Sequence, residues 1–181
     1  ALDYALKEFT TRLFAALEHA LSTLAGAGVP GVGKYRRLAH PSGGHEGFQM
    51  MIEEWSIIFV PLPGFARPNP LDEARIPAAQ FKDPCARIAV FLTDHPQTRA
   101  FYDFLIFQDG SWFAWGYGWP KQQSDIESTD FEALAMDLIY SFIKDIFRTW
   151  HTRDETVLAA ALDAKRRCFS FGLPGEERQG G

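Results

Sequence analysis

The segment 100–119, AFYDFLIFQDGSWFAWGYGW, constrains the fold of this chain more than any other segment. It consists of two apolar, aromatic-rich runs that are separated by Asp109-Gly110. Asp-Gly is a preferred dipeptide of the two-residue type I′ turn, because both central residues of that turn need a positive φ angle. The segment therefore predicts a β-hairpin, and the rest of the chain must supply a sheet and a core for it.

The predicted turn also sets the pairing of the two strands. With a two-residue loop, Trp115 lies opposite Phe104 on one face of the hairpin. That face carries a row of large apolar side chains: Tyr102, Phe104, Ile106, Phe113, Trp115 and Tyr117. We expect this row to be buried core, so that Trp115→Ala destabilises the fold. The alternative is an exposed binding platform, for which Trp115 and Trp119 are the candidate contact residues.

The segments outside the hairpin divide into helices and strands by their apolar spacing. Residues 3–25 have the three- and four-residue steps of an amphipathic helix. Thr129-x-x-Glu132 and Thr152-x-x-Glu155 are capping boxes, which predict the starts of two further helices. Further strands are predicted at the following ranges: 35–40, 47–60 and 86–93.

Two strand-region features leave alternatives open. The alternation within 47–60 changes phase at Glu53–Glu54, which indicates a strand with a β-bulge or a short helix that turns into a strand. Residues 61–84 contain six prolines and cannot form a central strand. That segment is expected to be a long loop, which either covers one sheet edge or has a functional role.

The order of these elements predicts an α+β fold. We expect an N-terminal helix, an antiparallel sheet of four to five strands, and two C-terminal helices packed mainly on one face. Residues 1–172 form one domain in this interpretation, and 173–181 form a flexible tail. The element order is similar to that of small secretion-chaperone-like adaptor domains, and this resemblance implies an adaptor role.

The segment 28–34, GVPGVGK, matches the phosphate-loop pattern G-x-x-x-x-G-K and is similar to the form found in AAA-type ATPases. The resemblance implies a nucleotide phosphate held by loop N–H groups and by Lys34. However, Tyr35 stands where the motif has the Ser or Thr that holds magnesium, and an amphipathic helix precedes it instead of a strand. We therefore predict that nucleotides do not bind, and interpret the segment as a linker.

Few residues have the spacing of a catalytic or metal site. His40 and His45 flank a glycine-rich turn, and Asp103 lies within an apolar strand, where a carboxylate needs a partner or an exposed position. These three residues are candidate ligand or partner contacts. Two histidines at this spacing match no zinc signature, and the two cysteines stand alone in their segments, so neither a metal nor a cofactor is predicted.

Composition excludes several classes of protein. With a net charge of -5, the chain as a whole lacks the excess of basic residues that is typical of nucleic-acid-binding proteins. No apolar segment is long enough to span a membrane. The sequence contains two short basic clusters, 34–37 and 165–167. Each is either a solvated surface or part of a binding surface for an anionic partner. The isolated cysteines and the absence of a signal-like N-terminal segment predict a cytoplasmic protein.

The leading functional hypothesis is a noncatalytic protein-interaction module, either monomeric or homodimeric, that acts as an adaptor, chaperone or regulator. It depends on the excess of aromatic residues and on the absence of a catalytic motif. The alternative is a small-molecule-binding protein or hydrolytic enzyme, with a pocket between the sheet and the C-terminal helices. Asp103, His40 and His45 are the polar groups of that pocket in the second hypothesis.

Overall fold

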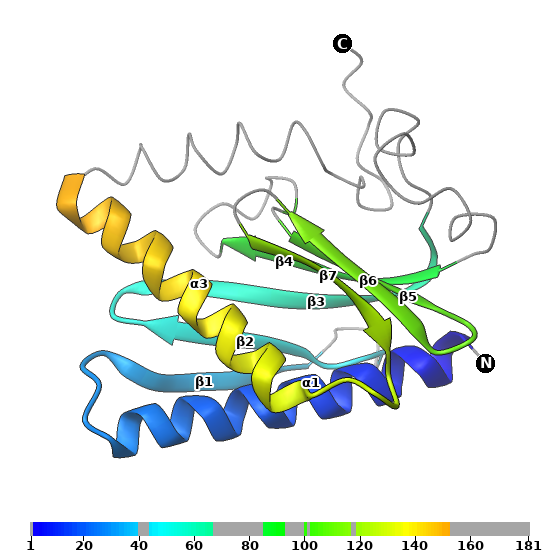
Figure 1. Ribbon diagram of the computed structural model, residues 1–181, viewed down its shortest axis with the longest axis horizontal. Helices are drawn as coiled ribbons and strands as arrows, with labels where there is room; N and C mark the ends of the chain where they lie inside the picture. Colours follow the sequence, from blue (N-terminus) through cyan, green and yellow to red (C-terminus); the bar gives the residue numbers. More distant parts are fainter. Residues whose placement is uncertain are drawn as a thin grey trace, which may run out of the picture.

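The computed structural model describes these residues: 2–39, 44–66, 85–92, 100, 102–116 and 119–152. Their elements are α1 (Leu2–Gly26), β1 (Val32–Leu38), β2 (Gly47–Ile52), β3 (Trp55–Ala66), β4 (Cys85–Leu92), β5 (Tyr102–Phe107), β6 (Ser111–Gly116), β7 (Trp119–Asp125) and α3 (Phe131–Thr152). The seven strands form one antiparallel sheet in chain order, so each strand pairs only with its neighbours in sequence (Figure 1). The mixed α+β class and the antiparallel sheet predicted from the sequence are confirmed.

The strand count differs from the four to five strands that the sequence predicts. One extra strand arises because 47–60 contains two strands, β2 and β3, and another because β7 follows the predicted hairpin. The helix count differs as well, since the described part of the chain has one helix after the sheet. That helix, α3, continues through Thr152, where the second C-terminal helix is predicted to begin. The remainder of that predicted helix, the tail 173–181 and residues 67–84 of the predicted loop lie outside the described residues. For residues 61–66 the loop prediction was wrong, because they are the end of β3, where Pro61 pairs with Ile88 of β4.

The phase change at Glu53–Glu54 is a hairpin turn and not a bulge. Ile52 pairs with Trp55, so the two residues between them form a two-residue loop. Glu53 adopts a positive φ of 54°, as tight hairpin turns require. In such a hairpin the residues on either side of the loop face the same side of the sheet. An apolar series that ends at Ile52 therefore resumes at Trp55, which explains the altered spacing.

The β5–β6 turn has one more residue than predicted. Ile106 pairs with Trp112, and the N–H of Gly110 donates to the carbonyl oxygen of Phe107 at 3.0 Å. Gly110 has a φ of 87°, which is the geometry of a type I turn followed by a left-handed glycine. The side chain of Asp109 favours this turn, because it accepts hydrogen bonds from the N–H and the hydroxyl of Ser111.

The longer loop shifts the predicted register by one residue, so the predicted aromatic row was wrong. Trp115 pairs with Asp103, and Phe104 pairs with Ala114. Phe113 pairs with Leu105, so its side chain lies on the face opposite Phe104. The helix-side position that was assigned to Trp115 is taken by Trp112, which is 2% exposed and lies 6.1 Å from Phe104 between ring centroids.

Both described helices share one core with the same face of the sheet. Buried residues of α1 and α3 form a continuous apolar cluster with alternate residues of β2 to β6. Phe9 of α1 lies near its centre, with ring centroids 5.5 Å from Phe104, 5.4 Å from Trp112 and 5.3 Å from Phe131. α3 crosses in front of the strands in Figure 1, with α1 running along the side of β1. The remaining strand residues face the opposite side of the sheet.

The glycine-rich segment 28–34 ends a helix and starts a strand. Gly28 has a φ of 80°, its N–H donates to Ala25, and the N–H of Val29 donates to Leu24. This pair of bonds is the Schellman motif that closes helix C-termini. Lys34 then lies within β1, whereas the lysine of a phosphate loop starts a helix.

Gly110→Ala should lower the free energy of unfolding by about 1–2 kcal/mol, because an L-residue resists the left-handed region. Gly26→Ala is the matched control, since an added Cβ has open space at both positions and Gly26 has no positive φ. Urea denaturation of the two variants separates backbone strain from steric effects. Equal stabilities would contradict the turn geometry.

Trp112→Ala should lower the free energy of unfolding by about 3–5 kcal/mol, because a buried aromatic side chain leaves a cavity. Met136→Ala is the control, since Met136 is 43% exposed on α3 and should change stability by less than about 0.5 kcal/mol. Thermal or urea unfolding measures both. A stable Trp112→Ala variant would show that this face of the sheet is not the core.

Candidate functional site

The face of the sheet opposite the helices contains a buried ion pair. Arg87 in β4 and Asp103 in β5 point away from the helix-side core, and their side chains are each 2% exposed. The Nε of Arg87 donates to Oδ1 of Asp103 at 2.5 Å. Desolvation of two charges is costly, so each buried charge needs the other as its partner in this position. Asp103, predicted as a ligand contact, thus has a structural partner.

The predicted histidines lie elsewhere. His45 precedes β2, and its Nε2 lies 2.6 Å from Oδ1 of Asp3 in the first turn of α1. His40 lies outside the described residues. Because α1 covers one face of the sheet and Asp103 points from the other, His45 and Asp103 do not converge. Within the described ranges no group of three or more His, Cys, Asp or Glu side chains could hold a metal ion.

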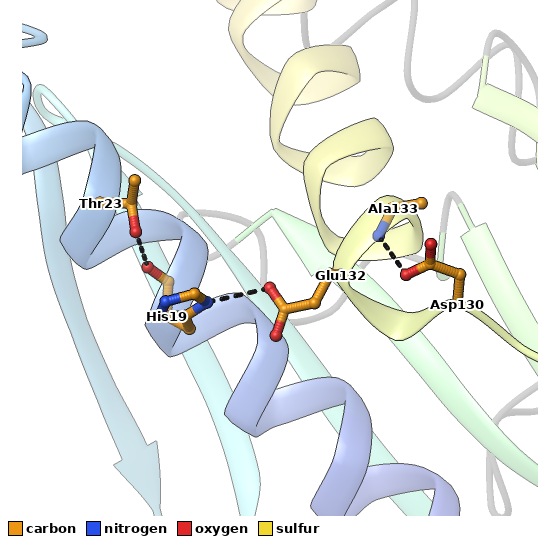
Figure 2. A network of polar contacts seen from close by, with 5 residues as sticks. All are labelled: His19, Thr23, Asp130, Glu132 and Ala133. Carbon is orange, nitrogen blue, oxygen red and sulfur yellow. Dashed lines mark hydrogen bonds and ion pairs between the residues drawn. The ribbon is translucent and has the colours of Figure 1, made fainter.

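A third histidine connects the two helices, as Figure 2 shows. The Nδ1 of His19 in α1 lies 3.0 Å from Oε2 of Glu132 in the first turn of α3. Asp130 caps that turn by accepting a hydrogen bond from the N–H of Ala133, so the predicted cap at Thr129 is displaced by one residue. Both side chains of the His19–Glu132 pair are largely exposed, so the contact adds little to the stability of the helix packing.

The structure describes an acidic cavity of about 500 Å³ at the N-terminal end of α1. It is bounded by the β5–β6 turn and by the connection from β7 to α3, and it contains four carboxylates: Glu8, Asp109, Asp125 and Glu127. Hydrogen bonds from Ser111 lower the pKa of Asp109, and hydrogen bonds from Ser128 lower the pKa of Asp125. These two carboxylates are thus anions that already accept local hydrogen bonds, and neither is suited to proton transfer near neutral pH.

The strand β1, which contains the basic cluster 34–37, is an edge strand of the described sheet, as β7 is. It pairs only with β2, so one side of its backbone has no strand neighbour within the described sheet. The four consecutive residues 34–37 are all exposed. Three of them are cations: Lys34 and Arg36 lie on one face of the strand, and Arg37 lies on the other.

On the α1 side, the side chains of β1 are held by their neighbours. The ring of Tyr35 stacks on Phe48 with centroids 5.9 Å apart. The Nε of Arg37 donates to Oε1 of Glu18 at 2.5 Å. These contacts fix the strand against α1 and β2 and neutralise one of its three cations.

On the opposite side of the strand lie Lys34 and Arg36. The Nε of Arg36 donates to the neutral amide oxygen of Gln49 at 2.5 Å, and Gln49 donates in turn to Ser56. Among the residues that the structure describes, neither Lys34 nor Arg36 forms an ion pair. The exposed edge therefore presents two unneutralised cations two residues apart.

Sequence reasoning located some of these residues and missed others. The cluster 34–37 was recognised as basic, but its position on an edge strand depends on pairing that a local pattern does not reveal. Arg87 was not singled out. The sequence did contain a clue to its ion pair, because two otherwise apolar strands each contain one charged residue, Arg87 and Asp103. Trp115 and Trp119 lie in β6 and at the start of β7, and their side chains fall outside the described part.

Comparisons with protein-family models, with curated proteins and with solved structures gave no match to this chain. Neither described helix is long and apolar enough to cross a membrane.

Breaking the buried ion pair should be more harmful than removing it. Arg87→Met leaves the Asp103 carboxylate buried without its cation, which should lower the free energy of unfolding by about 3–5 kcal/mol. The double variant with Asp103→Leu should recover much of that loss, because both charges are then absent. A urea-unfolding double-mutant cycle measures the coupling. Additive losses of less than about 1 kcal/mol each would show that the pair is solvated.

Proposed function

We propose that this chain is a noncatalytic protein-interaction module, an adaptor, chaperone or regulator, that binds its partner along the open edge of β1. The proposal depends on one observation: residues 34–37 are exposed on a strand that pairs with another described strand on one side only. An edge strand presents a row of backbone N–H and C=O groups that can pair with an added strand. Such pairing supplies affinity from the backbone and selectivity from alternate side chains.

The rigidity of β1 supports a binding role. A Cβ at Gly33 would lie 2.6 Å from the Cβ of Ala25, so the start of the strand lies directly against the end of α1. Further along, the stack of Tyr35 on Phe48 and the ion pair of Arg37 with Glu18 hold the strand in place. A preformed edge loses less conformational entropy when a partner binds than a flexible segment does.

The distribution of polar groups favours the interaction module over the enzyme. The space between the sheet and α3 is filled by apolar side chains, including Phe104 and Leu138, which are fully buried. Tyr102 is buried there, and its pKa is raised far above its usual range by burial and then by the charge of Asp137. A phenol that stays protonated is no general base at neutral pH.

Site-specific photocrosslinking tests the module. A photoreactive amino acid is placed at Lys34 or Arg36 on the edge, and at Lys7 or Lys144 on the exposed surfaces of α1 and α3. In cells that express the full chain, we expect one discrete protein adduct of the same mass at both edge positions and none at the control positions. Mass spectrometry identifies the protein, and titration calorimetry with that purified protein then has to reproduce the binding.

Three outcomes would contradict the proposal that this chain is a protein-interaction module. They are the absence of adducts at the edge, equal adducts at all four positions, and a purified partner that does not bind. The enzyme alternative gains support if native mass spectrometry of the purified chain finds a bound small molecule instead. Circular dichroism of each labelled variant confirms that the fold is retained.

A further inference from the structure

From the charges on β1 we infer that its open edge accepts an extended acidic peptide as an additional strand. This inference rests on the proposed function, since it specifies the chemistry of the partner that the edge binds. The chain as a whole is acidic, with a net charge of -5, but β1 carries Lys34, Arg36 and Arg37 and no acidic residue. The edge is therefore a basic strip on an acidic molecule.

The two cations of the strip that lack an anion lie on the same side of the strand. Arg37 points to the α1 side and is neutralised by Glu18, whereas Lys34 and Arg36 point to the opposite side and have no ion pair among the described residues. Residues two apart on a strand are separated by about 7 Å, because each residue advances by about 3.3 Å. Two carboxylates with the same spacing on an added strand would face both cations.

A second copy of this chain is a poor occupant of the same edge. If β1 paired with its own copy antiparallel about Tyr35, Lys34 of one chain would face Arg36 of the other, twice. Parallel pairing would also bring these cations close to their copies. Like charges directly opposite each other on neighbouring strands destabilise pairing. The charges that attract an acidic strand therefore disfavour a homodimer through β1.

The side chain between the two cations adds a second element of selectivity. Tyr35 points to the α1 side, where its ring covers Phe48 and is 36% exposed. A side chain opposite Tyr35 on the added strand would contact this ring and not the cations. The preferred peptide thus has the pattern acidic, apolar, acidic. The bulge between Val32 and Lys34, at Gly33, limits the regular edge to residues 34–38.

The test uses fluorescent peptides and the full chain, with fluorescence anisotropy at low salt. The first peptide alternates Glu and Val, the second alternates Lys and Val, and the third has the composition of the first with its Glu residues grouped together. Two further copies of the first peptide are N-methylated on odd or on even residues, which removes the N–H donors of one strand edge. We expect the alternating Glu peptide to bind and one N-methylated copy to bind about tenfold more weakly.

Charge reversal supplies the matched variants. Lys34→Glu with Arg36→Glu should weaken the alternating Glu peptide by about tenfold or more and create binding of the Lys peptide. Lys7→Glu makes the same kind of charge change on an exposed surface of α1 and should leave both affinities unchanged. Lys34→Gln with Arg36→Gln is a second test of the same loss if the reversed variant does not fold.

The outcomes separate this inference from the proposed function. Equal binding of the N-methylated, grouped and alternating Glu peptides would show simple ionic attraction, and it would overturn strand addition. Equal competition by a single-stranded oligonucleotide of the same charge would overturn a peptide ligand. If no acidic peptide binds but photocrosslinking at Lys34 and Arg36 gives a partner, the acidic ligand is wrong and the interaction module stands. If no acidic peptide binds and photocrosslinking gives no partner, both the acidic ligand and the interaction module are wrong.

Discussion

The packing of Phe9 is the interaction on which the arrangement of this protein depends most. Its ring contacts Phe104 in β5, Trp112 in β6 and Phe131 in α3, so one side chain joins two helices to two neighbouring strands of the sheet. Offset and edge-to-face ring contacts add to the gain from burial of the apolar area itself. Because α1 is fixed here, its other end is fixed as well, and that end holds β1 at the edge of the sheet.

The two faces of the sheet differ in the kinds of side chain that they bury. The helix side is an apolar core, whereas the opposite side combines buried apolar residues with the ion pair of Arg87 and Asp103. A buried charge pair contributes little net stability but makes alternative packing costly, since any shift of β4 against β5 separates the charges. The strands of this sheet otherwise offer rows of similar apolar residues. The ion pair thus distinguishes one register from its neighbours.

The sequence allowed the fold class, the two described helices and most strand positions to be predicted, because these depend on local apolar spacing. The hairpin register was wrong because the hydrogen bonds from Ser111 to Asp109 decide between a two- and a three-residue loop, and Asp-Gly fits both. The β2–β3 turn was missed because Glu53 in a positive-φ position is uncommon. For the candidate site, the basic residues of β1 were visible in the sequence, but their exposure at an edge follows from strand order.

The order of the strands also has a consequence for synthesis of the chain. Each strand pairs with the one made just before it, so the sheet can grow as the chain emerges from the ribosome. The apolar stripe of α1 cannot be covered in the same way, because two partners of Phe9, Trp112 and Phe131, are made much later. Part of the apolar side of α1 therefore stays uncovered until α3 is made. Apolar surface that is exposed during folding makes a chain prone to aggregation during that interval.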